Sequence, residues 1–156
     1  MISADVASWS LDGSVVVDAS VAFGWFAAVP GSDQAVRLLE ASPPLRLIAP
    51  DLVLIELLNA GWRSQRAGAI TSEQLDGIAQ LAPGLFTALV PSASLLQAAH
   101  RWCRLLDHPA YDCLYLALAE REGTSLITQD QRLLRKLQAT PEARSLALPL
   151  EAWPPS

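Results

Sequence analysis

The pattern of apolar and polar positions predicts short buried strands separated by helices. Residues 14–18, Ser-Val-Val-Val-Asp, are apolar on both faces of an extended chain and predict a buried strand that ends at Asp18. Further short apolar segments predict strands at 45–49, 86–90 and 125–128, and a fifth at 145–148. A strand with two apolar faces suits the middle of a parallel sheet that is covered by helices on both sides.

Between these strands, apolar residues recur at helical spacing. The predicted helices are 19–28, 32–41, 52–66, one from Thr71 to about Leu81, one to Leu106, one from Pro109 to Arg121, and 130–138. Their expected caps are Ser32, Asp51, a capping box over 71–74, and Ser92 or Ser94. Strands that alternate with helices predict an α/β fold, a three-layer α/β/α sandwich around a mainly parallel sheet of four or five strands.

The length of 156 residues fits one domain. We expect residues 1–13 to be an N-terminal extension, 14–150 the folded domain and 151–156 a Pro-rich tail. No apolar run reaches the roughly 18 residues that cross a bilayer, and the N-terminus lacks the pattern of a signal peptide. A cytoplasmic protein is therefore expected.

The overall charge changes this picture only in part. A net charge of −5 argues against a protein that coats nucleic acid through bulk attraction. Hydrophobic residues make up 51% of the chain and charged residues 17%, so the chain is globular and some apolar surface is expected to meet a partner.

Four acids stand where buried residues are expected. They are Asp18 after the first strand, Glu56 within an apolar helix, Asp112 before an apolar run, and Asp130 after the fourth strand. No basic residue is placed to pair obviously with all four. If the fold gathers them, each pair of carboxylates about 4 Å apart repels by roughly 4 kcal/mol, and a divalent cation removes this repulsion. All-oxygen ligands favour Mg²⁺ or Mn²⁺. The alternative is four unrelated acids, two of which cap helices.

Other chemistries fit the chain less well. His100 and His108 have no histidine or cysteine at zinc-ligand spacing, and Cys103 and Cys113 are expected to be free thiols. A receiver-like phosphoacceptor domain needs a late strand-end lysine, whereas the one lysine, Lys136, lies in a predicted helix. A haloacid dehalogenase-type phosphatase needs a second Asp two residues after Asp18.

Four motifs resemble a known family. They are Val-Val-Val-Asp-Ala-Ser at 15–20, Leu-Ile-Glu-Leu-Leu-Asn-Ala at 54–60, His-Pro-Ala-Tyr-Asp-Cys-Leu-Tyr-Leu-Ala-Leu-Ala-Glu at 108–120, and Leu-Ile-Thr-Gln-Asp at 126–130. In this order, and over about residues 15–137, they resemble the PIN-domain family, specifically the VapC-like toxins of bacterial toxin–antitoxin pairs. Each motif alone is weak, but the set in this order is specific.

The resemblance implies an α/β/α sandwich and a metal-dependent endoribonuclease, in which a metal-activated water hydrolyses RNA. Its Mg²⁺ or Mn²⁺ would be held by Asp18, Glu56, Asp112 and Asp130. The resemblance also implies that Ser20, Asn59 and Thr128 assist as polar groups around the metal. Local roles are the alternative for these three residues: a helix cap, a helix-surface amide and a strand-end hydroxyl.

The partners implied by the resemblance are an RNA substrate, a cognate antitoxin and a second copy of the chain. Arg63, Arg66, Arg132 and Arg135 could hold RNA phosphates or simply be solvated. Candidates for the apolar partner surfaces are Trp25, Phe26, Leu38, Leu39, Leu57 and Trp62, with core packing as the alternative. A non-toxin PIN nuclease, or a catalytically silent domain that binds RNA or protein, is the competing interpretation.

Overall fold

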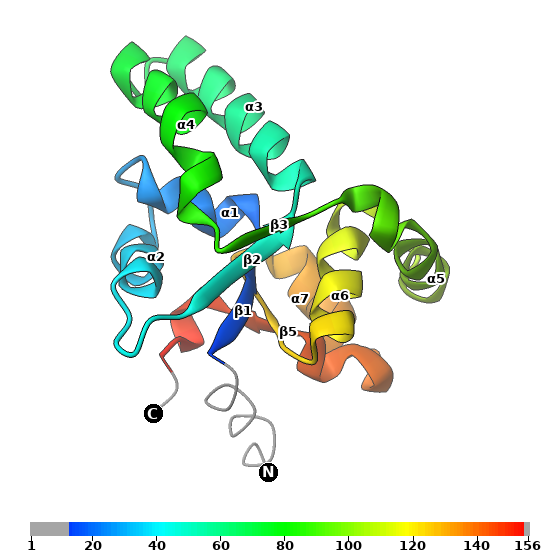
Figure 1. Cartoon of the computed structure of the whole chain (residues 1–156). Coiled ribbons are helices and arrows are strands. Elements are labelled where there is room, and N and C mark those ends of the chain that lie inside the picture. The colour runs from blue at the N-terminus through cyan, green and yellow to red at the C-terminus, as the bar shows by residue number, and fades with distance from the viewer. Residues whose placement is uncertain (1–12, 155–156) are drawn as a thin grey trace.

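Five parallel strands form the centre of the molecule, in the order β3-β2-β1-β4-β5 (Figure 1). The strands are β1 (Ser14–Val17), β2 (Arg46–Pro50), β3 (Ala88–Val90), β4 (Leu126–Thr128) and β5 (Ala147–Pro149). This computed structural model describes residues 13–154, so the predicted extension at 1–13 lies outside the described residues except for Gly13. The prediction of an α/β sandwich around a mainly parallel sheet of four or five strands is confirmed.

The first strand lies in the middle of the sheet, as its apolar sequence predicts. All four of its residues are buried, and Val16 is in register with Ile48 of β2 on one side and Leu126 of β4 on the other. From β1 the chain moves outward to β2 and β3, then crosses back to β4 and β5. The strand order therefore reverses beside β1, and ligand sites in such sheets lie beyond the carboxyl ends of the strands at this reversal.

Helices cover both faces of the sheet (Figure 1). Right-handed crossovers place the helices that precede β3 on one face and those that follow it on the other. The first face carries α1 (Ala19–Ala22), α2 (Ser32–Leu39), α3 (Leu52–Arg66) and α4 (Ser72–Leu85). The second face carries α5 (Leu96–Leu106), α6 (Ala110–Glu122) and α7 (Gln131–Gln138). Short 3₁₀ helices complete the chain: η2 (Phe23–Trp25), η3 (Ser92–Leu95), η4 (Pro141–Leu146) and η5 (Leu150–Ala152).

Helix α6 is the central helix of its layer. Every residue from Cys113 to Ala119 is buried, and the helix packs against β1, β2 and β4. A helix that is apolar all round has no solvent face, which explains the unbroken run of small and aliphatic residues. Its first turn, with Asp112, remains at the carboxyl edge of the sheet because the helix runs antiparallel to the strands.

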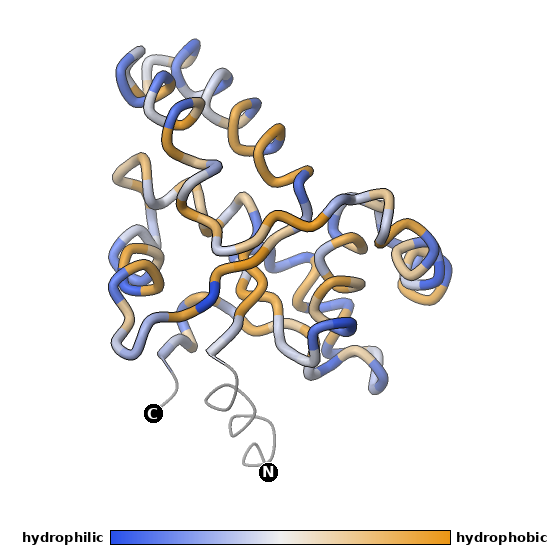
Figure 2. Tube along the Cα trace, in the orientation of Figure 1, coloured by the Kyte–Doolittle hydropathy of each residue, from blue (hydrophilic) through white to orange (hydrophobic). Residues whose placement is uncertain are grey.

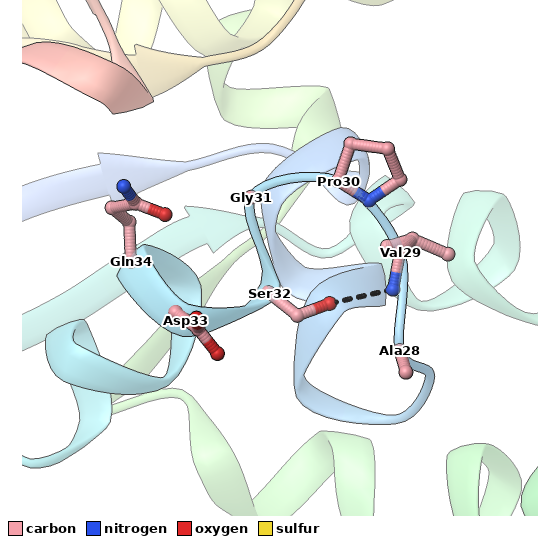
Figure 3. A pocket seen from close by; sticks show the side chains of 7 residues that line it. All are labelled: Ala28, Val29, Pro30, Gly31, Ser32, Asp33 and Gln34. Atoms are coloured by element: carbon pink, nitrogen blue, oxygen red, sulfur yellow. Dashed lines mark hydrogen bonds between the residues drawn. The ribbon is translucent and has the colours of Figure 1, made fainter.

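Two of the predicted caps are wrong, and a third has the predicted position but not the expected side-chain bond. Ser32 follows the N-cap Gly31; its hydroxyl instead accepts from the Val29 amide at 2.8 Å (Figure 3) and donates to the Ala27 carbonyl at 2.8 Å. Asp51 is the N-cap of α3, as predicted, but its carboxylate accepts hydrogen bonds from Ser92, and these bonds lower the pKa of Asp51. Ser92 is itself the first residue of η3. The capping box is present, because Thr71 and Gln74 bond reciprocally.

Several element boundaries differ from the prediction, for example the fifth strand, which is Ala147–Pro149 rather than 145–148. Three other differences have an identifiable cause. The helix expected over 19–28 ends as η2 at Trp25, since the chain then turns to make the Ser32 contacts. Helix α4 continues through Pro83, which removes only one helical hydrogen bond, to Leu85. Strand β3 begins at Ala88, and the preceding Thr87 is fixed to Leu47 by its backbone N–H and its hydroxyl.

Hydrophobic residues are concentrated on the strands, α6 and the sheet-proximal half of α3, while the far ends of α3 and α4 are hydrophilic (Figure 2). Leu38 and Leu57 are core residues, 1% and 0% exposed, so they do not form a partner surface. Trp62 is 47% exposed. Within residues 13–154, no helix is both long and apolar enough to span a membrane.

Candidate functional site

The carboxylate of Asp18 lies at the carboxyl end of β1, where the strand order reverses. It caps α1, because Oδ1 accepts from the Val21 amide at 3.2 Å. The same oxygen accepts from the Ser20 hydroxyl at 2.6 Å, and Oδ2 accepts from the Thr128 hydroxyl. Three donors, two from α1 and one from β4, thus hold the carboxylate of Asp18. The residue as a whole is 7% exposed.

The same two hydroxyls join the ends of β1 and β4. Thr128 Oγ1, fully buried, also accepts from the backbone N–H of Asp130 at 3.0 Å. Ser20 Oγ accepts from the Gln129 N–H at 3.1 Å. Each hydroxyl therefore donates to Asp18 and accepts from the loop after β4, and the two strand ends form one hydrogen-bonded unit.

Asp130 begins α7 as its N-cap. Its Oδ1 accepts from the Leu133 amide at 3.1 Å, which satisfies one of the free N–H groups of the first turn. The carboxylate therefore has a structural role, and Asp130 is linked to Asp18 by its backbone N–H, through the hydroxyl of Thr128.

Glu56, on α3, faces the same edge of the sheet from the other layer. Its Oε1 accepts a hydrogen bond of 2.5 Å from the phenol of Tyr115, which lies one turn after Asp112 on α6. The negative charge of Asp112 contributes to raising the pKa of both Glu56 and Asp18. Asp112 is thus close enough to affect both of the other acids electrostatically, and the helix of Glu56 faces α6, which carries Asp112.

Asp112 occupies the first turn of α6. Its Oδ2 is 2.5 Å from Nε2 of His108, and its side chain is 28% exposed. The helix dipole also favours an anion in this first turn. The carboxylate is therefore positioned by the turn before α6 and by the helix itself.

None of the four acids has an arginine or lysine partner among residues 13–154, where the ion pairs to basic side chains are Arg101–Glu120 and Arg121–Glu122. Burial raises the pKa of Asp18 to about 6, against the lowering effect of its hydrogen bonds. Burial also raises the pKa of Glu56, which the Tyr115 hydrogen bond partly offsets. The site consequently holds unneutralised carboxylates in a poorly solvated place.

Comparison with known proteins gives this arrangement its context. The family model for the PIN domain matches residues 15–138. Ribonuclease VapC3 of Mycobacterium tuberculosis is 35% identical over 132 residues, covering 85% of this chain and 91% of that protein. The chain belongs to the PIN-domain family. Ribonuclease VapC3 of Pyrobaculum aerophilum is 28% identical over 127 residues, covering 80% and 95%.

The fold of this PIN domain also matches a solved structure. The crystal structure of PAE2754 from Pyrobaculum aerophilum superposes with a TM-score of 0.59 at 23% identity and covers 92% of this chain and 93% of that one. The family match includes all four acids and both hydroxyl residues that contact Asp18, so the site described above lies inside the PIN domain.

The acidic side chains at this site are of the chemical type that binds a hard divalent cation. Asp18, Glu56 and Asp112 offer only oxygen, and no arginine or lysine among residues 13–154 pairs with them. In the part of the chain from 13 to 154, however, no three acidic, histidine or cysteine side chains converge as a metal-binding group. The carboxylates are instead directed at hydroxyl and imidazole donors.

The structure does not bring all expected residues to the acids. Asn59 is exposed and lines a hollow on α3 and α4 with Ile55, Leu58, Trp62 and Leu75. The four candidate RNA-binding arginines are all exposed, with Arg63 and Arg66 in the last turn of α3 and Arg132 and Arg135 on α7. Arg66 stacks its guanidinium over Trp62 at 5.1 Å.

Two residues of the site were missed by sequence reasoning, Tyr115 and His108. Tyr115 lies in an apolar run, where an aromatic residue indicates core packing rather than a donor to Glu56. The spacing of His108 and Asp112, four residues apart, was available in the sequence. It is a spacing at which side chains of one helix meet, although here the histidine lies in the turn before α6.

Proposed function

We propose that this PIN domain is a metal-dependent endoribonuclease, using Mg²⁺ or Mn²⁺, and that it acts as the toxin of a toxin–antitoxin pair. The observation that carries the proposal is the carboxylate of Asp18, buried at the reversal of the strand order with Asp112 beside it and without a basic partner. The relatives named as ribonucleases cover most of the chain, which supports the same activity.

The residues of the chain divide the chemistry among them. Asp18, Glu56 and Asp112 would hold the cation, and Asp130 would contribute from the start of α7. When bound, the cation would acidify a water and stabilise negative charge on the phosphate oxygens. Asp112 or Asp130 would orient that water, while Ser20 and Thr128 keep Asp18 in place through their hydrogen bonds.

RNA contacts are assigned to exposed arginines at two distances from the acids. Arg132 lies in the first turn of α7, directly after Asp130, and Arg135 follows one turn later. Arg63 and Arg66 lie about 10 to 15 Å from Glu56 along the helix axis at 1.5 Å per residue. The first pair can reach phosphates at the cleavage point, and the second pair phosphates further along the strand.

Partner surfaces are assigned to two apolar areas outside the acid site. One is the hollow formed by Ile55, Leu58, Asn59, Trp62 and Leu75, which we assign to the antitoxin. The other lies between α5 and α6, where Leu96, Cys103 and Leu114 line a mostly apolar hollow, and we assign it to a homodimer. We place the complex in the cytoplasm, where its RNA substrates are.

The activity can be tested with the purified chain and a pool of structured RNAs. Cleavage is expected with about 5 mM Mn²⁺ or Mg²⁺, because both are hard divalent ions that bind oxygen ligands. Cleavage is expected to stop in EDTA. Asp18→Asn and Asp112→Asn should each lower the cleavage rate by at least about a hundredfold while the protein stays folded, since each removes a ligand charge. Asp76→Asn, an exposed acid on α4, is the matched control and should cleave normally.

Cleavage that persists unchanged in EDTA would exclude this mechanism. If the chain bound RNA in a mobility-shift assay but did not cleave it with any divalent ion, it would be a binding domain that has kept the fold. Mapping the 5′ ends of cleaved RNA then identifies the substrate and cut site.

A further inference from the structure

His108 is held in place by both of the helices that it connects. Its backbone N–H donates to the Cys103 carbonyl of α5 at 3.4 Å, and its own carbonyl accepts from the Cys113 thiol of α6 at 3.7 Å. The preceding Asp107 ends α5 in a left-handed conformation with φ of 49°, and Pro109 is the N-cap of α6. The imidazole therefore has a fixed position next to the first turn of α6. The side chain of His108 is 2% exposed there.

The two ring nitrogens have very different surroundings. Nε2 is 2.5 Å from Oδ2 of Asp112, whereas Nδ1 is buried and has no hydrogen-bond partner among the described residues. A proton on Nδ1 alone would leave the Nε2 lone pair facing a carboxylate oxygen. A doubly protonated ring would bury an unpaired N–H. The neutral ring with its proton on Nε2 fits both environments best, because only a lone pair is left without a partner.

Filling the space below α6 does not require an imidazole. An apolar side chain of similar volume would fill it without an orphan polar atom. What the imidazole adds is one ring nitrogen that faces Asp112, whose side chain is otherwise partly open to solvent. Hydrogen bonds from a second layer of residues orient metal-binding carboxylates in this way.

We propose that His108 is a positioning residue, which donates Nε2–H to Asp112 and holds that carboxylate in the orientation in which it binds the divalent cation. The inference rests on the proposed metal-dependent function and extends it to a residue outside the group of acids.

The first test compares Mn²⁺ binding by calorimetry in variants that differ only at this donor. His108→Leu keeps most of the volume but has no donor, and its affinity for Mn²⁺ should fall by at least about tenfold. His108→Gln can still extend an amide N–H toward Asp112 and should stay within about threefold of the wild type. His100→Leu, an exposed histidine on α5, is the matched control and should bind normally.

The outcomes separate the two proposals. A wild-type protein that binds no Mn²⁺ would remove the metal-dependent function itself. A wild type that binds Mn²⁺, with His108→Leu binding equally well, would overturn only the role of His108. Equal losses in the leucine and glutamine variants would also overturn it, because the lost property would then be the shape of the ring.

A second measurement uses the wild-type protein without any metal ion. Long-range ¹H–¹⁵N spectra of the wild-type protein in EDTA report which ring nitrogen of His108 carries the proton. The Nε2–H tautomer is expected, with His100 as an internal comparison. A proton on Nδ1 would contradict the proposal, since His108 could not then donate to Asp112 as a neutral ring.

Discussion

Among single residues, Asp18 combines a structural and a chemical role. Its Oδ1 caps α1 and receives the Ser20 hydroxyl, and its Oδ2 receives the Thr128 hydroxyl. These donors do not fully offset the loss of solvation, because the pKa of Asp18 is still raised to about 6. The buried residue therefore retains its proton more readily in the folded protein than in the unfolded chain.

This difference makes the stability of the metal-free protein depend on pH. The folded pKa of about 6 exceeds the ordinary value of 3.8, so the folded state binds the extra proton between these values. The resulting stability is fully present below pH 3.8 and is lost as the pH rises through 6. Between pH 4.5 and 7.5 the contribution of Asp18 to the free energy of unfolding should fall by about 2 kcal/mol.

Urea denaturation in EDTA, at both pH values, measures this contribution as the difference between the wild type and Asp18→Asn. The free energy of unfolding of the asparagine variant, minus that of the wild type, should be larger at pH 7.5 than at pH 4.5. The reason is that the variant has no charge to bury at the higher pH. An identical difference at the two pH values would show that Asp18 titrates normally.

Residue-level prediction works for Asp18 because an apolar extended run that ends in an acid places that acid at the end of a strand. It fails for the Tyr115 phenol, whose bond to Glu56 joins helices from opposite faces of the sheet. It also fails for Asp51, where the expected local cap is replaced by Ser92 on a neighbouring segment. Local sequence gives no information about which distant donor competes for a carboxylate.

At the scale of elements, close contact between α3 and α4 depends on Gly61. A Cβ at this position would lie 2.6 Å from Cδ1 of Ile78 and 3.0 Å from Cδ1 of Leu75. Both of these side chains belong to α4. A side chain at this position would therefore require the ends of Ile78 and Leu75 to move.

We therefore expect Gly61→Ala to be less stable than Gly77→Ala, a matched change within α4 where a Cβ meets nothing within 4 Å. Gly77→Ala should gain about 0.5 to 1 kcal/mol from helix propensity. Gly61→Ala gains the same propensity but overpacks the interface, which costs about 1 to 3 kcal/mol. Urea denaturation of both variants decides the matter, and equal stability would mean that Ile78 and Leu75 move aside freely.

Helix periodicity predicts α3 from Leu52 to Arg66 because its apolar positions are encoded locally. The start of α4 is predicted equally well, since the capping box is made entirely by residues 71–74. The end of α4 is not, because continuation through Pro83 depends on packing that the sequence of the helix does not reveal. Local capping signals predict where this helix starts but not where it ends.

For the whole molecule, the parallel α/β class follows from the alternation of strands and helices, but the distribution of exposed apolar residues does not. Ile55, Leu58 and Trp62 are 65%, 41% and 47% exposed on one side of α3, whereas Leu57 between them is buried. A pattern of hydrophobic residues predicts that a helix is amphipathic, and only the fold shows which apolar side chains are left without a neighbour.

This exposed group gives a prediction about the partner. Trp62→Ser should leave the fold unchanged, but should weaken binding to a small antitoxin-like protein encoded by a neighbouring reading frame by at least about tenfold, as expected for an aromatic anchor. Titration of that protein against the cleavage reaction measures the effect. Leu81→Ser, another exposed apolar residue at 59%, is the control.

Unimpaired inhibition of Trp62→Ser would move the partner surface away from α3. The absence of any small neighbouring reading frame would instead favour a nuclease that acts without an antitoxin.

The hydrogen bond between Asp18 and Thr128 joins residues 110 positions apart. Strand β1 is separated from its neighbour β4 by β2, β3 and helices α1 to α6. The buried carboxylate consequently acquires the Thr128 donor only after β4 has been synthesised, and parallel strands with such long connections pair slowly. A nascent chain that stops before β4 thus lacks the assembled site, although the local donors Ser20 and Val21 are already present.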